Sequence, residues 1–283
     1  MNKLFDQKAK EQQTDTTTEA YQATQYLLRR IIPPELYYQL RTFSREYPVL
    51  FLPFSRWRWH RWRQKYCADP NAPEPAAPEP FNPDTEIVIE GYPRCGNTFA
   101  HIAFKVAQPR QVKIGHHTHA PAQVIAAVKN KIPTIVLIRD PEDAIVSYLV
   151  GGFDPGLTVK QALREYISFY GSILPYRRGF VLAQFEALKT DYGAVIRRVN
   201  QIYGTDFQEF EHTSVNVQKC FSLIDAGYEN IFGELSATVI SRPAPERMAL
   251  QQELRQTFQQ PQLESIRTKA YQIYTQLLTQ SSN

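Results

Sequence analysis

The chain has 283 residues, of which 43% are hydrophobic and 21% are charged, and it carries a formal net charge of +4 at pH 7. This composition is that of an ordinary globular protein and excludes a disordered or fibrous chain. The length suits one large α/β domain with appendages, because single cores stop growing near roughly 250 to 300 residues. The modest positive charge is compatible with a phosphorylated small molecule, an anionic membrane surface or nucleic acid, and does not choose among them.

The cysteines and the apolar segments indicate in which cellular compartment the protein is expected. Cys67, Cys95 and Cys220 are odd in number, widely scattered and without metal-ligand spacing, which indicates a reducing environment. The N-terminal stretch contains no continuous apolar segment of the kind found in secretory signals. The longest uncharged apolar run, Tyr47 to Phe54, is far shorter than the roughly 20 residues of a membrane-spanning helix. We therefore expect a cytoplasmic protein.

The N-terminal part of the sequence combines a polar tail with a helical extension. Residues 1–18 are rich in Gln, Thr and Lys and have too little apolar area to offset ordering entropy, so we expect them to be disordered. Apolar residues then recur at helical spacing, which predicts a helical and basic-aromatic extension over residues 19–66. Its last part, Ser55 to Tyr66, interleaves all three tryptophans of the chain with five arginines and lysines.

Three interpretations of the segment from Ser55 to Tyr66 follow from this composition. Tryptophans and basic groups suit a bilayer interface with anionic lipid, which makes the segment a peripheral membrane contact. Alternatively, the tryptophans pack on the catalytic domain while the arginines stay solvated. Stacking on single-stranded nucleic acid is the least favoured of the three, and we expect no nucleic-acid partner.

A proline-rich linker, residues 67–83, separates this extension from a catalytic domain over residues 84–283. The prolines favour an extended spacer. Beyond it, apolar runs of strand length alternate with segments whose apolar residues recur at helical spacing. The runs are Glu86 to Glu90, Thr134 to Arg139 and Gly179 to Gln184. This alternation predicts an α/β fold of three layers, a P-loop-like parallel sheet flanked by helices, preceded by the N-terminal helical extension.

The segment from Gly91 to Thr98, GYPRCGNT, follows the first predicted strand and opens a predicted amphipathic helix. In this context a glycine-containing turn presents backbone N–H groups to a phosphate. Asn97 replaces the lysine that an ATP or GTP hydrolase needs beside the β- and γ-phosphates, while a cation is present at Arg94. A tight turn without a ligand is the structural alternative. A nucleophilic thiol at Cys95 is a weaker one.

The stretch YPRCGNTF, residues 92–99, resembles the YPKSGTTW loop of the sulfotransferases that use 3'-phosphoadenosine-5'-phosphosulfate (PAPS). In that family the loop holds the 5'-phosphosulfate end of the donor. The resemblance implies that Arg94 takes the role of the family lysine, that Thr98 contacts the 5'-phosphate and that Phe99 packs on adenine. An arginine in place of the lysine keeps the charge and changes the hydrogen-bond geometry. The loop is completed by three further donor-binding candidates, Cys95, Gly96 and Asn97.

The segment from Thr134 to Tyr148 is similar to the second signature of that family, a strand followed by RxPxDxxVSYY and a helix. The similarity implies that Arg139 and Ser147 bind the 3'-phosphate. Arg139 leaves the carboxyl end of a predicted strand, where open α/β sheets bind ligands, and its guanidinium can offer two hydrogen bonds to a phosphate. The alternative is that Arg139 forms an ion pair with Asp140 or Asp143. Ser147 is then a helix-surface hydroxyl.

Between the two signatures, HHTHAP at residues 116–121 resembles the family's KTHLP segment, whose histidine is the catalytic base. The alignment selects His119, where a neutral imidazole can remove the acceptor proton. His117 replaces the family lysine. Three histidines so close in sequence also suggest zinc, but the adjacent His116 and His117 face apart in an extended segment. No cluster of carboxylates or cysteines accompanies them, so we expect no metal.

Weaker matches place further residues at the donor. FEALK, residues 185–189, is similar to the family's YEDLK and puts Phe185 near adenine. HTSV, residues 212–215, matches HTSF and puts Thr213 on the base. The family's RKGxxGDWK segment is not found after residue 215. We expect Arg242 or Arg247, which flank a predicted helix start, to replace it at the 3'-phosphate.

Together these segments imply an enzyme that transfers a sulfuryl group directly from PAPS, its co-substrate, to a hydroxyl or amine acceptor. The acceptor is expected to be a small molecule, a glycan or a lipid. Arg94 and His119 are the catalytic candidates. Two alternatives stay open. One is a P-loop nucleotide kinase with Asp140 as its metal-binding acid, and the other is a non-catalytic nucleotide- or membrane-binding relative.

Overall fold

The computed structural model describes residues 33–66, 78–152, 154, 156–232 and 247–279. The tail predicted to be disordered, residues 67–77 of the predicted linker and Arg242 lie outside the described residues. The chain divides into two compact units, residues 1–43 and 44–283.

The described part of the first unit belongs to helix α2 (Pro34–Glu46). On this helix the Arg41 guanidinium lies over the rings of Tyr37 and Tyr38, which are the first aromatic residues described.

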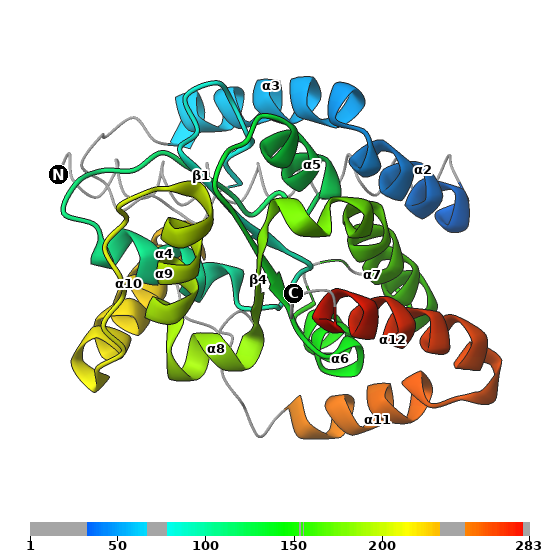
Figure 1. Cartoon of the computed structure of the whole chain (residues 1–283). Helices are drawn as coiled ribbons and strands as arrows, with labels where there is room; N and C mark the ends of the chain where they lie inside the picture. The colour runs from blue at the N-terminus through cyan, green and yellow to red at the C-terminus, as the bar shows by residue number, and fades with distance from the viewer. Residues whose placement is uncertain (1–32, 67–77, 153, 155, 233–246, 280–283) are drawn as a thin grey trace, which may run out of the picture. The chain divides into compact units, whose positions relative to one another are not determined.

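The second unit is built on a four-stranded parallel sheet (Figure 1). The strands lie in the order β2-β1-β3-β4. Every residue of β1 and β3 is buried, which explains why their sequences are nearly continuous apolar runs rather than alternating ones. The predicted α/β fold with a parallel sheet is confirmed. The strands are β1 (Ile87–Gly91), β2 (Ile114–His116), β3 (Thr134–Ile138) and β4 (Val181–Gln184).

Helices flank the sheet on both faces (Figure 1). Helix α4 (Asn97–Ala107) contacts β1 and β2 on one face, and α5 (Pro121–Lys129) covers β1 and β3 on the other. Further helices are α6 (Pro141–Val150), α7 (Val159–Ile173), α8 (Phe185–Thr190), α9 (Tyr192–Tyr203), α10 (Ser214–Phe232), α11 (Met248–Phe258) and α12 (Glu264–Thr279). The result is a three-layer arrangement of helices, sheet and helices.

The strand order places a topological switch point between β1 and β3. The chain leaves β1 through α4 to reach β2 on one side, and it leaves β3 through α6 and α7 to reach β4 on the other side. Because the two connections diverge, the carboxyl ends of β1 and β3 open toward the same region, which is where open α/β sheets bind ligands. Gly91 ends β1, and Arg139 directly follows β3.

Helix α3 (Pro48–Tyr66) belongs to the unit that contains the sheet. Its Leu52 is buried in a cluster with Phe81. The Phe81 N–H group donates to Gln123 Oε1 at 2.8 Å, and Arg56 Nε donates to the Phe81 carbonyl oxygen at 2.6 Å. The described end of the predicted linker is therefore anchored to both α3 and α5.

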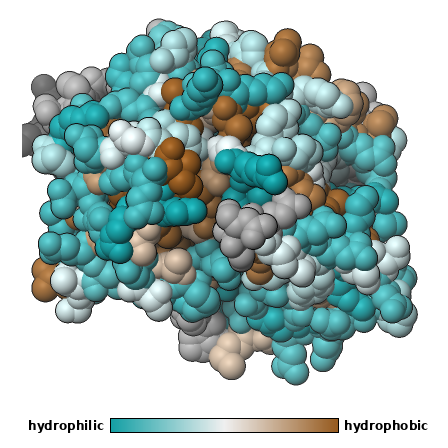
Figure 2. Space-filling view, viewed as in Figure 1, coloured by the Kyte–Doolittle hydropathy of each residue, from teal (hydrophilic) through white to brown (hydrophobic). Residues whose placement is uncertain are grey.

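One face of α3 carries exposed apolar side chains. Leu50, Phe54 and Trp57 are 54%, 58% and 55% exposed, and their spacing places them on one side of the helix. Figure 2 shows a hydrophobic group at one place on the mainly hydrophilic upper edge of the visible face, the edge at which Figure 1 draws α3. The guanidinium of Arg61 lies 5.2 Å from the Trp57 ring. More than half of the Trp57 side chain is therefore open to solvent. None of the described helices has the length and apolar character needed to cross a bilayer.

Candidate active site

The loop between β1 and α4 is a tight turn. A Cβ atom at Gly91 would lie 2.7 Å from the Leu137 carbonyl oxygen of β3. Gly96 has a φ of +91°, and a Cβ atom there would overlap the Leu188 side chain of α8. Arg94 also has a left-handed φ, 66°, which is uncommon for a residue with a side chain. Backbone strain of this kind clusters at ligand-binding turns.

The N-terminus of α4 has no side-chain cap, because Gly96 stands at the N-cap position. The first N–H groups of a helix have no intrahelical acceptor, so those of Asn97 and Thr98 can bind an anion. The Asn97 side-chain amide donates to the Tyr92 carbonyl oxygen at 3.0 Å. Asn97, in the position of the P-loop lysine, therefore holds the loop closed.

Three of the predicted donor-binding residues meet at this loop. Arg94 Nε donates to Ser147 Oγ of α6 at 3.1 Å. Arg139 Nη1 donates to the Arg94 carbonyl oxygen at 3.3 Å, although the two residues are 45 positions apart in sequence. The residues predicted for the 5' and 3' ends of the donor thus lie together at the carboxyl ends of β1 and β3.

Positive charge is concentrated at the loop. Burial lowers the pKa of the Arg94 guanidinium, and the positive charges of Arg247 and Arg139 lower it further. Arg247, one of the two C-terminal arginines expected at the donor, is buried at the start of α11. Like charges in a partly buried site repel one another, and an anion placed among them relieves that repulsion. This arginine cluster, Arg94, Arg139 and Arg247, is suited to bind phosphate.

Arg139 does not form the ion pairs that were its alternative explanation. Asp140 Oδ1 accepts from the backbone N–H groups of Glu142 and Asp143 at 2.9 and 3.2 Å and so caps α6. The Asp143 carboxylate pairs with Arg255 of α11 at 2.6 Å. Within the described part of the chain, Arg139 has no ion-pair partner, and its buried Nε has no hydrogen-bond acceptor. The ion-pair alternative is therefore wrong, and one edge of the guanidinium is left for a ligand.

Phe185 begins α8 and lies against the same group of residues. The Arg139 guanidinium carbon is 4.3 Å from the centre of the Phe185 ring. A Cβ atom on Gly96 would lie 3.3 Å from Phe185 Cδ2, so the ring also borders the loop. Its contact with adenine stays a prediction.

His119 lies beside the loop, and its hydrogen bond determines its tautomer. His119 Nδ1 is 2.8 Å from the Gly91 carbonyl oxygen, and because a carbonyl oxygen can only accept, Nδ1 carries the proton. Nε2 of the neutral ring then has the lone pair. Burial lowers the pKa of His119 to about 4, so the ring is neutral at pH 7. A neutral ring with a lone pair at Nε2 is the form that a general base requires.

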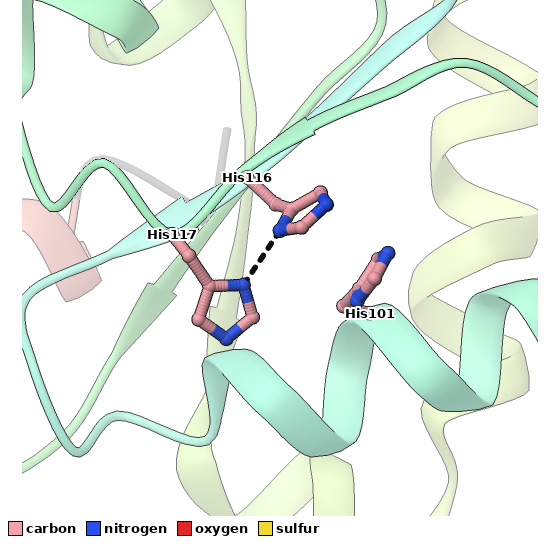
Figure 3. Close-up of side chains that lie close together, drawn as sticks. All are labelled: His101, His116 and His117. Carbon is pink, nitrogen blue, oxygen red and sulfur yellow. Dashed lines mark hydrogen bonds between the residues drawn. The ribbon is translucent and has the colours of Figure 1, made fainter. Parts of the chain in front are cut away.

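Figure 3 shows a histidine cluster, His101, His116 and His117. The ring centre of His117 lies 5.8 Å from that of His119. His101 projects from α4, while His116 and His117 come from the end of β2. The rings of His101 and His116 stack with their centres 3.7 Å apart, and the Nδ1 atoms of His116 and His117 are 2.7 Å apart. The expectation that His116 and His117 face apart is wrong, because a φ of 56° at His117 turns its side chain back.

The histidine cluster has the donor chemistry of zinc but not its geometry. One nitrogen from each ring lies within 4.8 Å of the others. Stacked rings, however, direct their in-plane lone pairs along nearly parallel lines. The 2.7 Å pair is also closer than the roughly 3.3 Å between two nitrogens bound tetrahedrally to zinc. Burial lowers the pKa of all three histidines well below its ordinary value, so the cluster is neutral, hydrogen-bonded packing.

This packing supports the start of α4. His117 Nε2 lies 3.1 Å from Thr98 Oγ1. The side chain of Thr98, which was predicted to contact the 5'-phosphate, is thus held by the segment that carries His119.

Two residues that were predicted to contact adenine, Phe99 and Thr213, make other contacts in the structure. The Phe99 ring centre lies 6.2 Å from that of Phe210 and 5.8 Å from that of Phe221. Thr213 Oγ1 accepts from the Asn216 N–H group at 3.2 Å and so caps α10. None of these contacts involves the arginine cluster or the Phe185 ring.

The Cys95 side chain points into the core. Its Sγ lies 3.4 Å from the Tyr170 hydroxyl, and burial raises the pKa of the thiol to about 12. The thiol is therefore protonated at pH 7, and the nucleophilic alternative is wrong. The Cys95 N–H group donates to the Tyr92 carbonyl oxygen at 3.3 Å and helps to form the turn.

Sequence reasoning missed Glu90 in β1 and Tyr166 in α7. Glu90 is fully buried, and four hydrogen bonds end on its carboxylate. The available signal was a charged residue at the end of an apolar, buried-type strand, a place where a carboxylate needs partners. The Tyr166 hydroxyl donates to the Arg139 carbonyl oxygen at 2.8 Å and fixes the end of β3.

Comparison with solved structures gives a weak likeness, whereas comparison with families and curated proteins gives none. Neither a protein-family profile nor a curated protein matches the chain. Among solved structures, the crystal structure of mouse sulfotransferase SULT7A1 complexed with PAP is similar. It is 12% identical in sequence, the match covers 69% of this chain and 91% of that chain, and the TM-score is 0.36. At this TM-score the likeness supports no argument about the site.

Proposed function

We propose that the protein is a sulfotransferase that moves a sulfuryl group from PAPS to a hydroxyl or amine acceptor. The observation that carries the proposal is the meeting of Arg94, Arg139 and Ser147 at the uncapped start of α4. A phosphate loop without the P-loop lysine but with several guanidinium groups suits a donor that has two separate anionic ends. The resemblance of residues 92–99 and 134–148 to PAPS-binding signatures supports the same donor.

Each residue has a role in this proposal. The N–H groups of Asn97 and Thr98 bind the 5'-phosphosulfate end at the positive end of the helix dipole. Arg94 stabilises the charge that develops on the departing phosphate oxygen. Arg139 and Ser147 hold the 3'-phosphate, and Arg247 adds positive charge beside them.

The reaction is an in-line displacement at sulfur. The acceptor oxygen or nitrogen forms a bond to sulfur while the bond between sulfur and the 5'-phosphate oxygen breaks, and the bonding pair leaves with the phosphate. His119 Nε2 takes the acceptor proton. The products are the sulfated acceptor, adenosine 3',5'-bisphosphate and an imidazolium that returns its proton to water. Arginine side chains and backbone N–H groups stabilise the negative charge of the leaving phosphate.

A P-loop nucleotide kinase is the competing function, and two observations count against it. Asn97 occupies the lysine position, and its amide is bound to the Tyr92 carbonyl oxygen. Asp140, the candidate metal-binding acid, has Oδ1 engaged by two backbone N–H groups at the start of α6. A carboxylate oxygen used as a helix cap is a poor ligand for magnesium, because the cap bonds must be given up first.

Thermal-shift measurements with adenosine 3',5'-bisphosphate and with ATP plus magnesium test the proposed donor. We expect the bisphosphate to raise the melting temperature more than ATP does. The gain should be smaller in Arg139→Ala and unchanged in Arg197→Ala, since Arg197 pairs with Glu209 on the surface. Stronger stabilisation by ATP with magnesium would favour the kinase. Conversion of PAPS to the bisphosphate with a panel of hydroxyl and amine acceptors then separates an enzyme from a non-catalytic binder.

The proposal extends to the acceptor and to the membrane. A small molecule, a glycan or a lipid fits the same chemistry, because each presents a hydroxyl group. We also propose that the exposed face of α3, with Phe54, Trp57 and Arg61, makes a peripheral contact with an anionic bilayer.

A further inference from the structure

Glu90 is a buried carboxylate that draws together two segments of the candidate site. Its side chain is fully buried in β1. Glu90 Oε1 accepts from the Gly91 N–H group at 3.1 Å. Glu90 Oε2 accepts from the Thr118 N–H group at 2.9 Å, from the Thr118 hydroxyl at 2.8 Å and from Gln123 Nε2 at 3.0 Å. One carboxylate therefore connects the phosphate loop, the segment after β2 and helix α5.

Two of the three residues that donate to this carboxylate are those that place His119. Gly91 supplies the carbonyl oxygen that accepts from His119 Nδ1, and Thr118 directly precedes His119. His119 has a left-handed φ of 49°, a conformation that the surrounding hydrogen bonds must maintain. Glu90 Oε1 itself lies 3.6 Å from His119 Nδ1. The carboxylate thus faces the ring edge opposite to the nitrogen that acts as base.

We propose that Glu90 is the positioning residue for the base: it holds the His119 ring against Gly91 and stabilises the imidazolium that forms when Nε2 takes the acceptor proton. This inference rests on the proposed sulfuryl transfer and adds a residue to the same site. A carboxylate beside the distal nitrogen of a catalytic imidazole fixes the tautomer and favours the cation. Glu90 contacts neither donor nor acceptor in this proposal and acts only through His119.

The charges around the pair give the expected pH dependence. Burial raises the pKa of Glu90 to about 7, while the hydrogen bonds from Thr118 and Gly91 oppose that rise. Among the described residues, His119 is the charged or titratable group within ion-pair distance of Glu90. The positive charge of Arg45 acts on His119 in the opposite sense and lowers its pKa. Ionised Glu90 is therefore the form that helps His119, and it becomes dominant above about pH 7.

The test compares wild type with Glu90→Gln, and Glu86→Gln is the matched control because Glu86 lies before the same strand and pairs with Arg110. The titration of the His119 ring is followed by nitrogen-15 NMR with adenosine 3',5'-bisphosphate bound, and PAPS turnover is measured from pH 5.5 to 8.5. We expect the ring signals of His119 in the wild type to shift as Glu90 ionises near pH 7 and this shift to be absent in Glu90→Gln. Turnover at high pH should be lower in the variant by about tenfold. The rise of wild-type turnover through pH 7 should disappear, and bisphosphate affinity should stay within about threefold.

A second variant keeps the test decisive if Glu90→Gln does not fold. Thr118→Val removes a hydrogen bond that lowers the pKa of Glu90, so the rise in turnover should move to higher pH. Identical His119 titration curves in wild type and Glu90→Gln, or an unmoved pH profile in Thr118→Val, would overturn the inference. Failure of wild type to consume PAPS would instead reject the proposed function. The NMR comparison needs no turnover and still decides whether Glu90 acts on His119.

Discussion

Arg139 reaches from the end of β3 to the end of β1 and donates from Nη1 to the Arg94 carbonyl oxygen at 3.3 Å. This contact holds the strained loop residue while leaving the Nε edge of Arg139 without a protein acceptor among the described residues. We predict that Arg139→Ala weakens the binding of adenosine 3',5'-bisphosphate by about 10- to 100-fold, the value of one or two charge-assisted hydrogen bonds. Isothermal titration calorimetry measures the change, and Arg197→Ala is the control. Equal affinities for the variant and wild type would place the phosphate elsewhere.

His119 provides the second prediction. Because its Nδ1 donates to the Gly91 carbonyl oxygen and not to a residue proposed to bind phosphate, His119→Ala should remove the base and leave the phosphate sites intact. We expect PAPS turnover to fall by about 100- to 10,000-fold and bisphosphate affinity to change little. Single-turnover kinetics and calorimetry separate the two effects. Near-wild-type turnover would show that another group takes the proton.

The histidines predict a loss of stability in acid. Burial lowers the pKa of His101, His116, His117 and His119 below that of an unfolded histidine, which is about 6.5. The unfolded chain therefore binds more protons than the folded protein below that pH. Their contribution to stability is fully present above pH 6.5 and is lost as the pH falls. Urea unfolding at pH 7 and pH 5 should show a lower free energy of unfolding at pH 5.

Glu90 works in the opposite direction. Its pKa rises to about 7 on folding, so between roughly pH 4.5 and 7 the folded protein binds the extra proton, and stability falls as the pH rises through that window. The effect of four histidines on stability exceeds that of one carboxylate. The free energy of unfolding should therefore still be higher at pH 7 than at pH 5. His101→Phe keeps an aromatic ring stacked on His116 and should reduce the difference in the free energy of unfolding between pH 7 and pH 5. His60→Gln, at an exposed position of α3, should leave this difference unchanged. A difference of the reverse sign would show that the cluster is not neutral in the folded protein.

Gly96 allows a test of the loop that needs no ligand. A Cβ atom there would overlap Leu188, and the φ of +91° is unfavourable for any side chain. We predict that Gly96→Ala lowers the free energy of unfolding by about 2–4 kcal/mol, the sum of the backbone and overlap costs. Gly204→Ala is the matched control, because Gly204 also has a positive φ, but a Cβ atom there would meet no described atom within 4 Å. It should cost only about 1–2 kcal/mol. Equal losses in the two variants would show that Leu188 moves aside without cost.

The exposed face of α3 predicts binding to anionic vesicles. Flotation with phosphatidylserine-containing vesicles should recover wild type at low salt, and recovery should fall as salt rises, since each basic residue near the surface adds about 1 kcal/mol. Trp57→Ala should reduce recovery severalfold, because the ring is 55% exposed and lies on the apolar face. Ile202→Ala, which removes an exposed apolar side chain from α9, should not. Wild type that fails to float, or that floats equally on neutral vesicles, would contradict the proposed contact.

The sequence predicted the sheet well because its strands carry strong local signals. The apolar runs from Glu86, Thr134 and Gly179 correspond to β1, β3 and β4, since strands covered on both faces must be apolar throughout. Strand β2 was not predicted. It has three residues, Ile114 to His116, and pairing with β1 rather than local composition determines its conformation. Short strands of this kind follow from tertiary contacts.

In the candidate site, too, the sequence predicted the residues that belong to local motifs and not the features that depend on tertiary contacts. Arg94, Arg139 and Ser147 were predicted from motifs, and the structure brings them together. The convergence of the His116 and His117 side chains was not predictable from the sequence. It depends on the left-handed backbone of His117, whereas an extended segment would direct the two side chains to opposite sides. Glu90 was overlooked for a related reason, since its partners come from segments distant in sequence.

The bridge between Glu79 and His116 has a consequence for how the protein behaves at high concentration. Their backbones exchange two hydrogen bonds of 2.9 Å on the side of β2 that faces away from β1. An uncovered strand at the border of a sheet offers its N–H and C=O groups to a second chain and promotes aggregation. Here Glu79, in the described part of the proline-rich linker, occupies that position at His116. Removing the linker would expose the strand that leads to His119, so a truncated protein that begins after residue 83 should self-associate more readily than the full chain.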